Sequence, residues 1–348
     1  MATLLDSTDL TARLTAAPRP WRRVDIHDVV DSTNTVAAAH AAQDGQPWTL
    51  VAADHQSGGR GRQGREWVSP PGTSISLSMV VPLGRPRAGG RVAAGPAGRV
   101  GWLPLITGLA VARTLGRFSR RRDAFALKWP NDVLGRPVSI DAAGAPGAAG
   151  EPGAARLPEH KVCGILCQSL WSTGEPLAVV GIGINVTVPA DQLPVPNATS
   201  LADCCAGPVP TREHVIVALA DEFVRWHERF TAGGVAMEEI RSAYDVACAT
   251  LGAHVQVHLP GGRVMAGRAE RVDAQGRLIV REGLDVAAEP RASDGPSALR
   301  TVRSGGSADE GGEDFSGWES DAQAGQVRGA GRLHALAAGD VIHIRREV

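Results

Sequence analysis

Apolar and polar positions along the first 250 residues predict several helices. A helix is expected to begin at Ser32, because Ser, Thr and Asn favour helix starts, and to end at Gly45. A second helix is predicted over residues 101–122, where it ends in three arginines. A third is predicted to start at Thr211, because apolar residues then recur at helical spacing: Val215, Leu219, Phe223, Trp226 and Phe230.

Strands are predicted between these helices. Residues 51–56 and 73–81 have the apolar and β-branched composition typical of strands. Residues 177–188 are apolar on both alternating faces, as in a strand buried inside a sheet. The alternation favours an α/β fold for residues 24–250.

The pattern changes after Gly252 to short alternating strands separated by turns. These strands are expected over residues 254–259, 263–272, 277–282 and 341–345. They predict a small β-barrel within residues 251–348, and residues 1–23 are left as an N-terminal extension.

Two segments are expected to be flexible insertions. Residues 141–155 contain only Ala, Gly, Pro, Asp and Glu, which provide no large side chain to bury against a core. The first insertion is placed at about 135–160, in the α/β domain. The second is placed at about 287–331, ahead of the last predicted strand.

Composition limits the classes of function. The chain of 348 residues has a net charge of -1, which argues against general nucleic-acid binding because phosphate neutralisation requires a basic excess. It has no signal peptide and no apolar run long enough to span a membrane, so a cytoplasmic protein without membrane association is expected. The five cysteines lack metal-binding spacing and are expected to be reduced thiols.

The stretch GGRGRQGREW, residues 58–67, satisfies the dinucleotide-binding pattern GxGxxG. That pattern must open a helix, and Pro70 and Pro71 exclude one here. The stretch instead predicts a ligand-binding loop between two strands. Its glycines let the backbone approach a ligand, its arginines match phosphate or carboxylate oxygens, and Trp67 can cover an adenine ring. A solvated basic hairpin is the alternative.

A second group of polar residues is KWPND, residues 128–132, and a third is Lys161. Asp132 beside Asn131 suggests a Mg²⁺ site, because Mg²⁺ commonly takes one or two carboxylates together with substrate phosphates. Lys161 would add a point charge. Each also has a simpler interpretation, a turn at residues 130–132 and a solvated lysine.

Five motifs together resemble the biotin protein ligases. They are DSTN (31–34), HQSGGRGRQGREW (55–67), KWPND (128–132), KVCGIL (161–166) and GIGINV (181–186), in the order seen in that family. The resemblance spans roughly residues 24–282 and the final strand. It implies a mixed β-sheet with helices packed on one face for residues 24–250, followed by a small C-terminal SH3-like β-barrel. The Arg-Gly loop with KWPND distinguishes biotin ligases within the wider biotin and lipoate ligase superfamily.

The resemblance implies a reaction in two steps. Biotin reacts with ATP to give biotinyl-5'-AMP and pyrophosphate, and a lysine of a biotin carboxyl carrier protein or domain then takes the biotinyl group. ATP and biotin would be substrates and Mg²⁺ the metal. Neither step requires a nucleophile from the enzyme, so positioned Arg, Lys and backbone amides suffice for catalysis.

The resemblance also implies residue roles. The catalytic residues would be Lys161, Arg60 and Arg62. Biotin would be bound by Ser32, Thr33, Asn34, Gln56, Gly59, Arg60, Lys161, Gly164, Leu166 and Gly183, with Gly181 beside them. ATP and the adenylate would be bound by Arg60, Arg62, Arg65, Trp67, Lys128, Asn131 and Asn185, and the metal by Asp132. Helix capping by Ser32 and tight strand packing at Gly181 and Gly183 are the structural alternatives.

The connection between Asp132 and Lys161, 28 residues, is longer than the resemblance leads us to expect. Three other functions are considered. A lipoate-type ligase is the nearest enzymatic alternative. A non-catalytic biotin-binding protein would not need Lys161, Asp132 and the loop arginines together. A ligase that is also a repressor would need a DNA-binding module, for which the segment before Asp31 is short.

Overall fold

The computed structural model describes residues 4–84, 100–121, 123–138, 158–170, 175–195, 197–259, 264–283, 332–337 and 340–343. The predicted insertion at 287–331 and most of the one at 135–160 lie outside the described residues. No helix among the described residues is long and apolar enough to cross a membrane.

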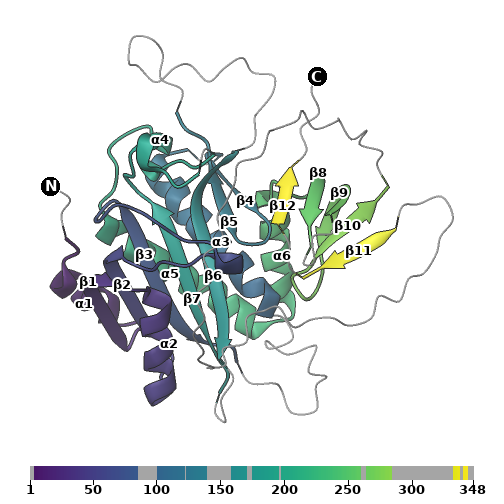
Figure 1. The fold of residues 1–348 in the computed structure, drawn as a ribbon. Coiled ribbons are helices and arrows are strands. Elements are labelled where there is room, and N and C mark those ends of the chain that lie inside the picture. Colours follow the sequence, from purple (N-terminus) through teal and green to yellow (C-terminus); the bar gives the residue numbers. More distant parts are fainter. Residues whose placement is uncertain are drawn as a thin grey trace, which may run out of the picture.

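A seven-stranded mixed sheet forms the centre of the fold (Figure 1). The strand order is β1-β2-β3-β7-β6-β5-β4. The β1 and β2 strands pair in parallel, and each other neighbouring pair is antiparallel. The strands are β1 (Arg23–Val30), β2 (Thr49–Gln56), β3 (Ser74–Pro82), β4 (Phe125–Lys128), β5 (Asp132–Gly135), β6 (His160–Leu170) and β7 (Leu177–Asn185).

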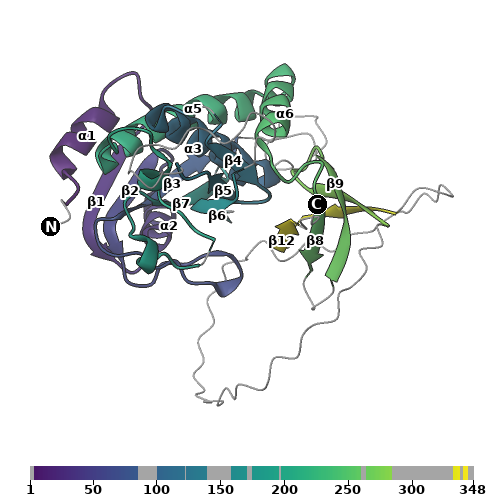
Figure 2. The same cartoon turned by 90° about the horizontal axis from the view of Figure 1, so that it is seen from above.

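Helices cover both faces of this sheet, so the expectation that they pack on one face is wrong in part. Figure 2 shows α2 on the face opposite α3 and α5. Adjacent residues of β2 explain why, because Leu50 packs into the core with α3 and α5 whereas Val51 packs with Ala37 and Ala41 of α2. The helices are α1 (Ser7–Thr15), α2 (Thr33–Asp44), α3 (Leu103–Ser119), α4 (Leu201–Cys204), α5 (Arg212–Ala232) and α6 (Val235–Ala247), with a 3₁₀ turn at Ala190–Gln192.

Helix ends agree with the sequence at α2 and differ at α3. The α2 helix begins after Ser32, and Gly45 ends it with a left-handed φ of 62°. The α3 helix ends at Ser119, because Arg120 takes the left-handed C-cap conformation with φ 59°. The predicted continuation of this helix to residue 122 is therefore wrong.

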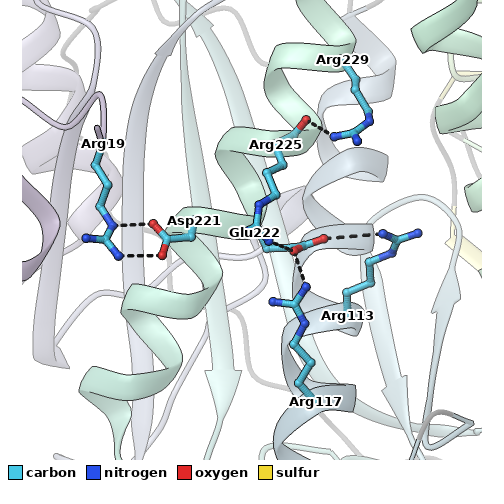
Figure 3. Close-up of polar contacts among 7 residues, drawn as sticks. All are labelled: Arg19, Arg113, Arg117, Asp221, Glu222, Arg225 and Arg229. Atoms are coloured by element: carbon cyan, nitrogen blue, oxygen red, sulfur yellow. Dashed lines mark hydrogen bonds and ion pairs between the residues drawn. The ribbon is translucent and has the colours of Figure 1, made fainter. Parts of the chain in front are cut away.

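The predicted N-terminal extension is packed into the core. In α1, Leu10 and Leu14 are completely buried. Beyond that helix, Arg19 forms two bonds to Asp221 of α5, with Nε to Oδ1 at 2.5 Å and Nη2 to Oδ2 at 2.8 Å (Figure 3). The backbone N–H of Leu5 donates to the carboxylate of Asp54 at 3.1 Å. The segment thus stabilises the edge of the sheet that carries β1 and β2.

A buried carboxylate joins α3 to α5. The side chain of Glu222 is only 3% exposed and lies among three arginines (Figure 3). Arg117 and Arg225 each donate to Glu222 Oε2 at 2.9 Å, and Arg113 lies 3.8 Å from Oε1. Such a charge is tolerated inside a protein only when it is paired, and here the partners come from both helices.

The C-terminal strands form a separate antiparallel sheet with the order β11-β10-β9-β8-β12. The sequence predicted four of them and missed β11. They are β8 (His254–His258), β9 (Val264–Val272), β10 (Leu278–Glu282), β11 (Leu333–Leu336) and β12 (Asp340–His343). The β9–β10 turn contacts the main domain, because Trp102 and Trp129 donate their indole N–H groups to its carbonyls.

Candidate active site

One pocket of about 510 Å³ brings together the five sequence motifs. Gly59 is the one predicted site residue that does not line it. The pocket wall includes these predicted residues: Ser32, Thr33, Asn34, Gln56, Arg60, Arg62, Arg65, Trp67, Lys128, Asn131, Asp132, Lys161, Gly164, Leu166, Gly181, Gly183 and Asn185.

The first part of the site is a buried polar network at the start of α2. Gln56 Oε1 accepts from Thr33 N–H at 2.7 Å and from Thr33 Oγ1 at 2.9 Å. Ser78 Oγ lies 2.8 Å from Thr33 Oγ1 and 2.6 Å from Asn34 Oδ1. The Ser32 hydroxyl makes no capping hydrogen bond, so the helix-capping alternative is not observed. The network fixes the orientation of groups that could bind a neutral polar ligand.

Ser78 was not among the predicted site residues. It lies on β3 and is completely buried. The available signal was the spacing of Ser74, Ser76 and Ser78, which put hydroxyls at every second position of an apolar strand. A strand with polar side chains on one buried face needs partners for them.

Three glycines of β6 and β7 make room for protein side chains. A Cβ at Gly183 would lie 2.5 Å from Cε2 of Trp67, and a Cβ at Gly164 would lie 3.1 Å from Cζ3 of the same ring. A Cβ at Gly181 would overlap Asn34. These positions therefore place Asn34 and Trp67 against the sheet, a form of the packing alternative that shapes the pocket.

The Arg-Gly loop is a hairpin that returns on itself. Arg60 and Glu66 form a β-bridge, and a 3₁₀ turn, Arg62–Gly64, lies between them. The N–H of Trp67 donates to Gly59 O at 2.8 Å, which explains why Gly59 supports the loop without lining the pocket. No α-helix follows, in agreement with rejecting the dinucleotide-binding pattern. The hairpin alternative is correct for the backbone, although Arg62 is partly buried and faces the pocket.

The positively charged part of the site lies around KWPND. Lys128 ends β4 and pairs with Asp132 at the start of β5, so the motif is also the predicted turn. Lys161 Nζ lies 2.8 Å from Asp132 Oδ1, so this lysine is ion-paired and not simply solvated. Burial lowers the pKa of Lys128, an effect that Asp132 opposes. Arg62 Nη1 donates to Asn131 Oδ1 at 3.2 Å, which connects the loop to the turn.

Three buried polar atoms of pocket-lining residues have no hydrogen-bond partner among the described residues. Asp132 Oδ1 is ion-paired with Lys161, which leaves Nε1 of Trp67 and Oδ1 of Asn185. Asn185 is held by its other amide atom, because Nδ2 donates to Thr199 O at 3.1 Å. Nearly all buried polar groups in proteins are paired, so these two are suited to contact a bound ligand.

His258 and Trp129 also line the pocket, and the sequence did not indicate either. His258 lies at the end of β8, in the C-terminal sheet. Its place in the wall depends on how two sheets pack together, for which the sequence offers no local signal. Trp129 lies inside KWPND, but the sequence analysis assigned roles only to Lys128, Asn131 and Asp132 of that motif.

Comparisons with known proteins agree with this arrangement. Residues 26–185 match the Biotin/lipoate A/B protein ligase family. A biotin--[acetyl-CoA-carboxylase] ligase of Mycobacterium tuberculosis is 31% identical over 285 residues, which cover 80% of this chain and 91% of that protein. The enzyme of the same name from Paracoccus denitrificans is 32% identical and is covered to 91%, over 72% of this chain.

A solved structure shares the fold. The biotin protein ligase of Aquifex aeolicus in complex with biotin and ATP superposes with a TM-score of 0.54 at 23% identity, covering 75% of this chain and 92% of that one. The two curated relatives confirm the family resemblance inferred from the five motifs. The chain belongs to the biotin/lipoate A/B protein ligase family.

Proposed function

We propose that the protein is an ATP-dependent biotin ligase. It activates biotin as biotinyl-5'-AMP with release of pyrophosphate, and then transfers biotin to a lysine of a biotin carboxyl carrier protein or domain. The two relatives described above are named as ligases for acetyl-CoA carboxylase, which supports a carboxylase carrier as the acceptor.

One observation supports this function above others, the order of polar groups along β6 and β7. Leu166 pairs with Gly181 beside Asn34, and Gly164 pairs with Gly183 beside Trp67. A Cβ at Gly164 would also lie 3.3 Å from Lys161 Nζ. Along β6 and β7 the pocket wall therefore changes from neutral hydrogen-bonding groups near Asn34 to positive charge at Lys161. Biotin has the matching order, a neutral ureido ring at one end and a carboxylate at the other.

In the first step, a carboxylate oxygen of biotin attacks the α-phosphorus of ATP and the bond to pyrophosphate breaks. Two anionic groups must approach each other, so the barrier is lowered by fixed positive charge. Lys161 and Arg62 are the residues we assign to this role. The network of Gln56, Thr33 and Asn34 orients biotin, while Asn131, Asn185 and Trp67 contact the nucleotide.

In the second step, the amine of the acceptor lysine attacks the carbonyl carbon of the mixed anhydride. AMP leaves, an amide forms, and the amine loses its proton. The protein again supplies no nucleophile and acts by positioning the adenylate. Arg60 and Arg65 are exposed in the loop beside the pocket, where they can neutralise the phosphate that leaves with AMP.

The site also suits Mg²⁺ carried in with the nucleotide. The described residues contain no group of three or more His, Cys, Asp or Glu that could hold a metal. The carboxylate of Asp132 lies beside Lys161 in the pocket, which Glu66 also lines. Mg²⁺ in nucleotide enzymes commonly takes one or two carboxylates and completes its shell with phosphates and water. Bound with ATP, it would neutralise phosphate charge.

The domain organisation follows from the same proposal. Residues 24–250 form the ligase domain and residues 251–348 an SH3-like domain whose five strands close into a small barrel. Pairing of β11 with β10 and of β12 with β8 puts β11 and β12 at the two edges of the described sheet, so these are the two strands that would meet if the barrel closes.

Pyrophosphate release from ATP tests the function directly. We expect release with biotin and not with lipoate or without an acid. Transfer of labelled biotin to a purified carrier domain then tests the second step. Release with lipoate alone would favour the lipoate ligase alternative, and binding of biotin without any release would favour a non-catalytic protein.

A further inference from the structure

Trp129 connects the nucleotide side of the pocket to the C-terminal sheet. Its side chain is 1% exposed, and its indole Nε1 donates to Gly276 O at 3.1 Å. Its backbone N–H donates to Thr250 Oγ1 at 3.0 Å. Thr250 lies in the connection between α6 and β8, whereas Gly276 lies in the β9–β10 turn, so Trp129 is bonded both to the entry of the second sheet and to a turn of that sheet.

The β9–β10 turn that accepts the indole bond is held by internal hydrogen bonds and by close backbone packing. Asp273 Oδ1 accepts from the backbone N–H groups of Gln275 and Arg277, both at 2.9 Å. Gly276 has a φ of +85°, and a Cβ there would lie 2.5 Å from the carbonyl carbon of Gly101. The backbone of the turn therefore rests directly on the residues before α3, with no side chain between them.

Trp129 lies between two residues that we assign to the nucleotide. Lys128 precedes it and is partly buried. Asn131 follows two positions later and is held by two bonds to Ile165: its backbone O accepts from Ile165 N–H at 2.9 Å, and its Nδ2 donates to Ile165 O at 2.9 Å. Asn131 also accepts from Arg62. A shift of Trp129 would move the KWPND turn, and with it Lys128, Asn131 and the Arg62 side chain bonded to Asn131.

We propose that Trp129 is a positioning residue through which the β9–β10 turn of the C-terminal sheet sets the affinity for ATP. This rests on the proposed function for the assignment of Lys128 and Asn131 to the nucleotide. Biotin binding is expected to be insensitive to it, because Gln56, Thr33 and Asn34 lie on β2 and α2, neither of which contacts the turn through the bonds described.

The structure provides a matched control. Trp102 is also completely buried, and it donates its indole N–H to Asp273 O of the same turn at 3.0 Å. It does not line the pocket. Trp129→Phe and Trp102→Phe therefore remove the same kind of bond to the same turn, and each leaves an aromatic ring in the core. A purely structural role predicts the same behaviour for both.

We expect Trp129→Phe to raise the dissociation constant and the KM for ATP about tenfold, the scale of one lost buried hydrogen bond, with the KM for biotin unchanged. Trp102→Phe should leave both KM values unchanged. The two variants should lower the melting temperature by similar amounts. Equal rises in the ATP constants for the two variants, a parallel rise in the KM for biotin, or no change in Trp129→Phe would overturn the proposal.

A second pair of variants covers the case in which Trp129→Phe does not fold. Thr250→Val removes the acceptor of the Trp129 N–H and keeps the shape of the side chain, whereas Thr250→Ser keeps the hydroxyl. Weaker ATP binding in Thr250→Val with recovery in Thr250→Ser supports the proposal, and equal behaviour of the two contradicts it. Titration of each variant with ATP alone measures nucleotide binding without any reaction, so it tests this proposal independently of catalysis. The proposed function is tested separately and fails if the parent protein releases no pyrophosphate with biotin.

Discussion

The indole of Trp67 lies against the backbone of Gly183 so closely that any side chain at residue 183 would collide with it. A Cβ built there meets three ring atoms within 2.9 Å, the nearest at 2.5 Å. A loop residue and a strand residue, more than a hundred positions apart, thus define one wall of the pocket. The glycine is required by the tryptophan as much as by a ligand.

Gly183→Ala should displace Trp67 and impair the site. We expect the rate of biotin-dependent pyrophosphate release to fall by about tenfold or more, because small displacements of a binding wall cost much in rate. Stability should fall by about 1–3 kcal/mol, as for other overpacked sites. Gly116→Ala is the control, since the nearest atom to its Cβ would be 3.9 Å away. Unchanged kinetics in Gly183→Ala would show that Trp67 can move at no cost.

Lys161→Ala should abolish most adenylate formation. Removing one preorganised charge contact typically costs about 10² to 10³ in rate. The loss of the pair with Asp132 should cost only about 1 kcal/mol of stability, because both side chains are partly exposed. Pyrophosphate release and thermal unfolding measure the two effects. Near-normal release in a folded variant would remove Lys161 from the mechanism.

Arg62→Gly should weaken retention of the adenylate more than it slows adenylate formation. Arg62 donates to Asn131 and so connects the loop to the KWPND turn, whereas Lys161 still serves the first step. A less closed loop would expose a reactive anhydride to water and to other amines. The measurement is biotin on lysines of added albumin, together with AMP formed without a carrier. Loss of activity without albumin labelling would instead mean that Arg62 acts only in adenylate formation and has no part in retaining the adenylate.

Leu14→Ala should destabilise the whole ligase domain. Leu14 of α1 is completely buried, and such truncations usually cost about 2–5 kcal/mol. Leu4→Ala is a matched control in the same segment, because Leu4 is 59% exposed. Urea unfolding gives both values. Equal stability of the two variants would mean that the segment before β1 does not belong to the cooperative unit.

The residues that meet in the pocket could be selected from the sequence because they lie in short contiguous motifs. GGRGRQGREW could be interpreted as a ligand loop without a following helix, since Pro70 and Pro71 act locally. The start of α2 at Ser32 and its end at Gly45 were likewise local signals. The family resemblance rested on the same motifs, and the comparisons confirm it.

The tertiary structure decided which groups face each other, because that depends on strand register and packing between distant segments. Ser78 joins Thr33 and Asn34 only because β3 lies beneath the start of α2. α2 can pack on the second face because the central strands are apolar on both sides. The sequence of β7 indicated a strand buried on both faces, but it did not indicate which helix covers each face. Trp129 meets Gly276, 147 residues later, because two sheets pack together, and no local pattern encodes that contact.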